Sequence, residues 1–159
     1  MNDRGVSTVL SYALALGILA ILVSGLVVSF APFVTNQQQD TAQSALVVYG
    51  NDLAGDLDTV DRLALEADGN ENATVSYRTE LPDRVSGSRY HVEIEEVDAT
   101  EGTYDYEIWL RPVDFEASTF VNVRTRTPIA DETLDESFEA GSLLIEYDAG
   151  ERELVIRDA

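Results

Sequence analysis

One uncharged stretch, residues 5–39, constrains what this chain can fold into, because the nearest charged residues are Arg4 and Asp40 on either side of it. From residue 9 to residue 34 the stretch is almost wholly apolar, and as an α-helix those residues would extend over roughly 39 Å. The hydrocarbon core of a bilayer is about 30 Å thick, and a helix that is apolar on every side is typical of a membrane span. A chain of 159 residues can hold one such span and one modest domain.

The net charge lies entirely outside this stretch. The chain has 30 acidic and 10 basic residues and a formal charge of −20; Asp3 and Arg4 cancel, so residues 40–159 carry all of it. Every basic residue is arginine. Hydrated carboxylates keep a surface wet where water activity is low, and salt screens their mutual repulsion. The composition therefore predicts a halophilic protein, and the alternative is an ordinary acidic or disordered tail.

Composition and motifs also exclude classes of function. A nucleic-acid-binding protein needs a basic face, and a chain this acidic does not supply one. The absence of cysteine excludes disulfides, thiolate metal sites and cysteine nucleophiles. The sequence contains no serine–histidine–aspartate, phosphate-loop or dinucleotide-binding pattern. We therefore expect no enzyme, no cofactor and no nucleic-acid partner.

The polar head, residues 1–4, is too short for the n-region of an ordinary secretory signal, and the apolar run is longer than the h-region of a cleaved one. Two interpretations remain open. Either the run is a plain N-terminal membrane anchor, or a short leader is removed before it and the helix stays in the mature protein. Arg4 and the lack of basic residues just after the run favour a cytoplasmic N-terminus and an extracellular C-terminal domain.

The residues DRGVSTVLSYALALGILAILVSGLVVSF resemble the N-terminus of archaeal type IV pilin-like proteins, especially those of haloarchaea. In that family a prepilin peptidase removes a short charged leader, which here implies a cut between Arg4 and Gly5, or alternatively after Gly5. Such subunits are held in the membrane before assembly, and their apolar helices then pack together in a filament. The resemblance thus implies three partners, namely the membrane, a prepilin peptidase and other pilin-like subunits.

A second helical pattern follows over residues 36–69, with apolar positions three and four apart. Gly50 and Gly55 each weaken this helix by about 1 kcal/mol relative to alanine, and Gly69 is a suitable stop. We expect an amphipathic continuation that packs one face on a β domain, and the alternative is a coiled-coil seam between copies. The apolar stripe consists of Ala42, Leu46, Tyr49, Leu53, Leu57, Val60 and Ala64, and Asp52, Asp56, Asp58 and Asp61 lie off it.

After residue 73 the period changes to two, which predicts strands over residues 73–79, 89–97, 103–111, 119–127, 142–147 and 153–157. Short links predict two antiparallel hairpins, one around residues 98–102 and one around residues 148–152. Residues 128–141 are expected to form an acidic loop or a short helix. The predicted fold is α+β and pilin-like, in which a long N-terminal helix packs on one antiparallel sheet. Its segments are a leader (1–4), a transmembrane or polymerisation helix (5–35), an amphipathic helix (36–69) and an acidic β domain (70–159).

Few residues are candidates for site chemistry. His91 lies opposite in phase to the apolar strand face, so we expect a surface histidine rather than a catalytic or metal-binding one. Asn72 begins an N-x-Thr glycosylation sequon in an expected turn. An acidic cluster lacks the spacing of a calcium loop, and we expect no metal there. Its members are Asp131, Glu132, Asp135, Glu136 and Glu139.

Three functions compete for these features. The first is a structural subunit, a minor pilin or pilus-associated protein, of an extracellular type IV pilus-like filament. The second is a single-pass membrane-anchored surface binding protein of a halophile that never polymerises. A membrane-anchored enzyme is a third, which the missing catalytic motifs disfavour.

Overall fold

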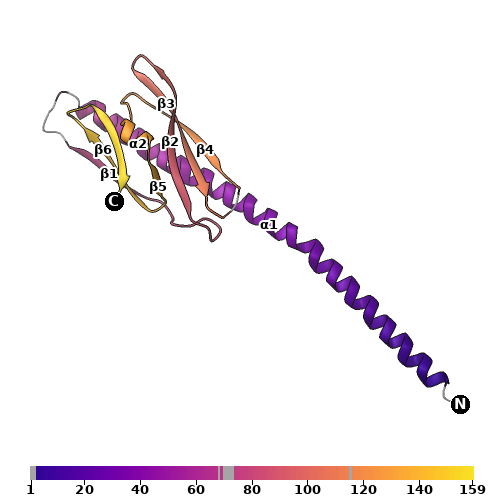
Figure 1. Ribbon diagram of the computed structural model, residues 1–159. Helices are drawn as coiled ribbons and strands as arrows, with labels where there is room; N and C mark the ends of the chain where they lie inside the picture. Colours follow the sequence, from indigo (N-terminus) through magenta and orange to yellow (C-terminus); the bar gives the residue numbers. More distant parts are fainter. Residues whose placement is uncertain (1–2, 68, 70–73, 115) are drawn as a thin grey trace. The chain divides into compact units, whose positions relative to one another are not determined.

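The computed structural model describes residues 3–67, 69, 74–114 and 116–159, and the side chains of these residues except 3–9 and 30–36. It confirms the α+β class, because one long helix, α1 (Asp3–Ala67), precedes a set of antiparallel strands (Figure 1). The chain separates into two compact units, Met1–Gln38 and Gln39–Ala159. The first unit contains the N-terminal part of α1, and the second contains its C-terminal part and all the strands.

The second unit contains two antiparallel sheets. One has three strands in the order β1-β6-β7, and the other has four in the order β4-β3-β2-β5. An isolated parallel bridge between Ile129 and Leu154 joins the segment after β4 to β7. The strands are β1 (Val75–Glu80), β2 (Tyr90–Thr100), β3 (Thr103–Pro112), β4 (Thr119–Thr125), β5 (Ser137–Glu139), β6 (Ser142–Asp148) and β7 (Glu153–Asp158), with a short helix α2 (Asp131–Leu134).

Both predicted hairpins are confirmed. In the first, Thr100 pairs with Thr103, and Gly102 in the intervening turn has a φ of 80°, a value that favours glycine. In the second, the Asp148 carboxylate accepts the backbone N–H of Gly150 at 2.7 Å, which closes the turn between β6 and β7. A glycine backbone conformation therefore favours the first turn, and a side-chain hydrogen bond stabilises the second.

One expectation about the sheets was wrong, and another was incomplete. The single predicted sheet is two sheets, because β1 pairs with β6 rather than with the β2–β3 hairpin. Residues 128–141 contain not only a short helix but also β5, which pairs with β2 through Phe138 opposite Val92. A three-residue strand with one apolar residue is too short to show a period in the sequence.

The C-terminal part of α1 supplies one side of the core of the second unit. All seven positions of the predicted stripe face this core: six are fully buried, and Tyr49 is half-buried with its ring 6.2 Å from that of Tyr90. One hydrophobic cluster includes this stripe and residues of both sheets, such as Ile108 and Ile145. Full burial of each leucine contributes about 1.5–3 kcal/mol, so the stripe dominates the attachment of the helix.

Gly50 allows α1 to approach the four-stranded sheet closely. A Cβ atom at this position would lie 2.7 Å from Cγ2 of Val121 and 3.0 Å from Cδ1 of Leu110. Gly55, one and a half turns further on, has nothing within 4 Å of the same added atom. Glycine lowers helix stability at both positions. At position 50 the close packing against Val121 and Leu110 offsets this loss, and at position 55 no such contact exists among the described residues.

Asp61 does not lie on the solvent side of α1, contrary to the expectation from the stripe. It is buried, and its carboxylate accepts the backbone N–H of Thr127 at 2.8 Å and that of Arg126 at 3.1 Å. The N–H of Ile129 is held in a similar way by the Tyr106 hydroxyl at 2.9 Å. The chain after β4 has left its ladder here, so these side chains replace the missing strand partners.

Gly50 and Gly55, both in the C-terminal part of α1, make a matched pair. Gly55→Ala should stabilise the 39–159 unit by about 0.5–1 kcal/mol through helix propensity alone. Gly50→Ala has the same propensity gain but must displace Val121, so it should be less stable than Gly55→Ala by about 1–3 kcal/mol. Urea denaturation of both variants tests this, and equal stabilisation would contradict the close approach.

Asp61→Ala should destabilise the second unit by about 2–3 kcal/mol, because it leaves one buried and one partly buried backbone N–H group without an acceptor. The exposed Asp52 on the same helix is the control, and Asp52→Ala should change stability by less than about 0.5 kcal/mol. Chemical denaturation followed by circular dichroism measures both. An Asp61→Ala variant as stable as the control would show that this carboxylate is dispensable.

Candidate functional site

The first unit contains a helical span that is uncharged and mostly apolar. Leu10–Ser29 has a mean hydropathy of 2.3, and none of this window is buried. Twenty helical residues extend over about 30 Å, the thickness of a bilayer core. The span is therefore long and apolar enough to cross a membrane, as a signal sequence near an N-terminus would also be.

The hydroxyl groups in the later half of this span are satisfied within the helix. Ser24 Oγ donates to the carbonyl of Ala20 at 2.8 Å, and Ser29 Oγ donates to that of Gly25 at 2.8 Å. Hydrogen bonds of this kind let a polar side chain face an apolar environment without an unpaired donor. Gly17 and Gly25 have nothing within 4 Å of an added Cβ, so their sides of the helix are open.

The structure describes the backbone of the predicted processing residues but not the predicted glycosylation residue. The backbone of Arg4 and Gly5 lies in the first turns of α1, and their side chains are outside the described part. Asn72 lies outside the described residues altogether. Cleavage after Arg4 and glycosylation at Asn72 therefore stay predictions.

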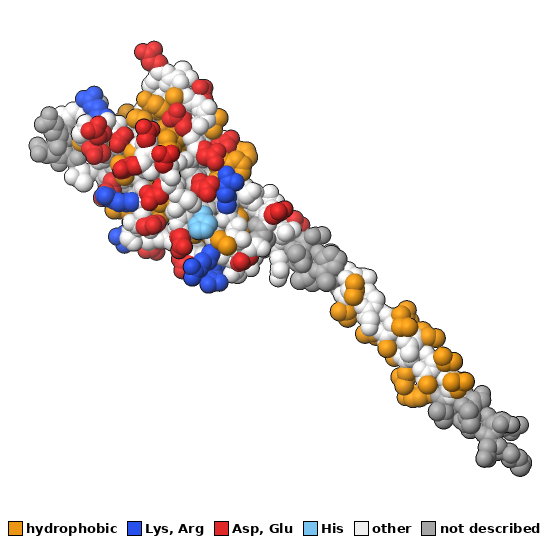
Figure 2. Space-filling view, in the orientation of Figure 1, with side chains coloured by type: hydrophobic (Ala, Val, Ile, Leu, Met, Phe, Trp, Pro, Cys, Tyr) orange, Lys and Arg blue, Asp and Glu red, His pale blue; other side chains and the backbone are white. Residues whose placement is uncertain are grey.

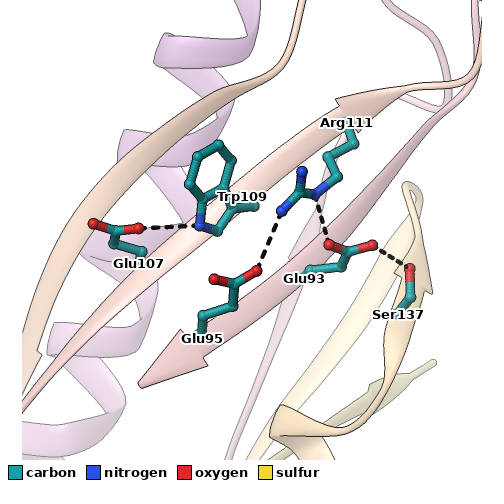
Figure 3. Close-up of polar contacts among 6 residues, drawn as sticks. All are labelled: Glu93, Glu95, Glu107, Trp109, Arg111 and Ser137. Atoms are coloured by element: carbon teal, nitrogen blue, oxygen red, sulfur yellow. Dashed lines mark hydrogen bonds and ion pairs between the residues drawn. The ribbon is translucent and has the colours of Figure 1, made fainter. Parts of the chain in front are cut away.

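The outer face of the four-stranded sheet has a network of carboxylates held by a few donors (Figure 3). Arg111 on β3 donates from Nε to Glu93 at 2.6 Å and from a terminal nitrogen to Glu95 at 3.2 Å. Ser137 on β5 donates to the other oxygen of Glu93 at 3.5 Å. The pairs are partly exposed, so each is worth about 0–1 kcal/mol, but together they hold the carboxylates in place.

Two aromatic rings lie beside this network. Trp109 is directly opposite Phe120 on β4, with ring centroids 4.9 Å apart, and its indole N–H donates to Glu107 at 3.1 Å. The guanidinium carbon of Arg111 is 4.5 Å from the Trp109 ring centroid, within the range of a cation–π contact. The alternation of residues 103–111 places Trp109 and Arg111 opposite the apolar positions of the strand, but only the register between β3 and β4 brings the two rings together.

His91 also lies on this face, as expected of a surface position. In register it is opposite Arg111 on β3 and Glu139 on β5, and it is half-buried between them. Further along the sheet, both guanidinium hydrogen bonds of Arg124, at 2.6 and 2.9 Å, go to Asp105. Those hydrogen bonds lower the pKa of Asp105 and keep it ionised.

The acidic segment after β4 folds into α2 and β5, with its carboxylates at the surface. Asp131, Glu132, Asp135, Glu136 and Glu139 are all exposed. Among the residues that the structure describes, no group of three or more histidine, aspartate or glutamate side chains is arranged to hold a metal ion. Slight burial, and then the charges of Glu151, Asp148, Glu132 and Asp131, raise the pKa of Glu153. Figure 2 shows acidic side chains spread over the visible face of this unit.

These features divide into an apolar helical span and an acidic domain surface whose carboxylates are hydrogen-bonded or solvated. Comparison with curated proteins and comparison with solved structures each found no match. A family model does match, and it extends over residues 1–157. The chain therefore belongs to DUF7266, a family of unknown function.

Proposed function

We propose that this chain is a pilin-like structural subunit, a minor pilin or a pilus-associated protein, of an extracellular type IV pilus-like filament. The observation that carries the proposal is the exposed apolar span Leu10–Ser29, which belongs to the same helix, α1, that later forms the core of an acidic β domain. The resemblance of the first residues to archaeal pilin-like proteins adds a processing site between Arg4 and Gly5.

The exposed apolar span Leu10–Ser29 is not covered by any other part of the described chain. A fully exposed helix with this hydropathy must be covered, either by lipid or by other apolar helices. Gly17 and Gly25 leave room for a close helix neighbour, and the internally bonded hydroxyls of Ser24 and Ser29 suit both environments. The same span can therefore lie in the membrane before assembly and between copies afterwards.

The charge distribution supports a cytoplasmic N-terminus and an environment of concentrated salt. The single basic residue before the span is Arg4, and the acidic domain that follows contains the whole net charge of −20. A cytoplasmic N-terminus and an extracellular domain agree with the tendency of basic residues to stay inside. We further propose that the acidic, lysine-free surface is an adaptation to concentrated salt, in which its self-repulsion is screened.

Leader removal is the first test. Intact-mass measurement of the protein from membranes and from sheared filaments should show a chain that has lost residues 1–4. Gly5→Leu should block this cut, because a prepilin peptidase reads a small residue at the cleavage site. Gly17→Leu, the same change within the span, should leave processing intact. A retained leader, with the protein confined to membranes, would favour the non-polymerising anchored surface protein instead.

Salt dependence is the second test. The 39–159 unit should melt at a lower temperature in dilute buffer than in molar salt, because dilute buffer leaves its acidic surface unscreened. Amide replacements at Asp131, Glu132, Asp135 and Glu136 remove four exposed negative charges and should reduce this dependence. Differential scanning calorimetry measures both proteins. A melting temperature that ignores salt would contradict the halophilic adaptation.

A further inference from the structure

A cleft on the second unit differs in charge from the rest of the acidic surface. It has a volume of about 280 Å³ and lies between the segment after β1, the start of β2 and the end of β5. Its lining includes three of the few basic side chains of the domain. The charged and titratable residues around it are Asp83, Arg84, Arg89, Tyr90, His91 and Glu139.

Two arginines at this cleft form no ion pair with any carboxylate that the structure describes, although acids outnumber bases threefold in the chain. Arg84 donates to the carbonyl of Gly87 at 2.9 Å, and within the described part of the chain neither Arg84 nor Arg89 forms an ion pair. Asp83 and Glu139 line the same cleft without pairing with them. By contrast, four other arginines are paired: Arg62 with Asp58, Arg111 with Glu93 and Glu95, Arg124 with Asp105, and Arg157 with Glu146.

A buried tyrosine also borders this cleft. Tyr90 lines the cleft and is 1% exposed, and its hydroxyl has no hydrogen-bond partner among the described residues. Burial, then the neighbouring Tyr49 and Asp83, raise the pKa of Tyr90, so the phenol keeps its proton. The cleft thus presents two exposed guanidinium groups, which suit an oxyanion, next to a tyrosine that stays neutral.

We propose that this cleft binds the carboxylate of an aspartate or glutamate side chain from a second copy of the chain. The inference rests on the proposed assembly and names one contact in it. Copies that each carry a charge of −20 repel one another, and an unpaired guanidinium offers a carboxylate a bidentate, attractive contact. Every copy presents many carboxylates, so the complementary group is always at hand. A contact between two different patches can also repeat along a filament.

The lysine-free sequence allows a direct test by zero-length coupling. Arg89→Lys introduces the only side-chain amine of the chain, and a carbodiimide joins such an amine to a contacting carboxylate as an amide while it takes up the water. Arg78→Lys, at an exposed position on β1 away from the cleft, is the matched control. Full-length protein in membranes and in sheared filaments is treated, and mass spectrometry identifies the joined peptides.

We expect a product of twice the chain mass in which position 89 is joined to an acidic peptide of the same protein, at a yield about tenfold or more above the control. Coupling only to Asp83 or Glu139 of the same copy, coupling to a different protein, or a yield equal to the control would each overturn the proposal. Filaments with a processed subunit but without this product would refute the cleft contact alone. The product in membranes, with a retained leader and no filaments, would refute the filament role and keep the contact between copies.

Charge reversal provides a second readout that does not need a new amine. Arg84→Glu with Arg89→Glu should reduce the sheared filament fraction about tenfold or more, because two attractive groups become repulsive. Arg62→Glu with Arg78→Glu makes the same change in net charge at two exposed arginines outside the cleft. Both proteins should be processed and held in the membrane. Equal loss of filaments in the two variants would show a general charge effect and overturn the proposal.

Discussion

The structure depends on the burial of one stripe of α1 against two sheets. In the second unit, Leu46, Leu53, Leu57 and Val60 are completely buried, and the hydrophobic cluster around them includes strands that have no ladder in common. Without the helix, each sheet would expose an apolar face of several large side chains. The helix is therefore the element through which two small sheets form one core, because neither sheet has enough partner surface on its own.

The sequence predicted what depends on local periodicity and turn chemistry. The seven-residue stripe of α1 and both hairpins follow from spacings of three, four and two, and the structure has all of them. Sheet partition was missed, since pairing of β1 with β6 joins residues that are far apart in the chain. The burial of Asp61 was missed for a related reason. Its carboxylate accepts the N–H groups of Arg126 and Thr127, and only the tertiary fold brings these groups to it.

The candidate functional surfaces also divide into one that the sequence predicts and others that need the tertiary fold. The apolar span is visible in the sequence as an absence of charge. The structure adds that the span is helical and that none of it is buried. The fixed carboxylates around Arg111, the Trp109–Phe120 pair and the cleft at Arg84 and Arg89 all need cross-strand or loop geometry. Composition could show that arginine is scarce, but it could not show which arginines lack an acidic partner.

The anchorage of α1 also determines how the second unit would respond to mechanical load. A pull along the helix axis has to slide the buried stripe past both sheets, so many side-chain contacts resist in shear at once. The fit of Gly50 against Val121 and the hold of Asp61 on the segment after β4 oppose such sliding at two separate heights on the helix. A domain built in this way passes tension from its helix into both sheets through many side-chain contacts at once.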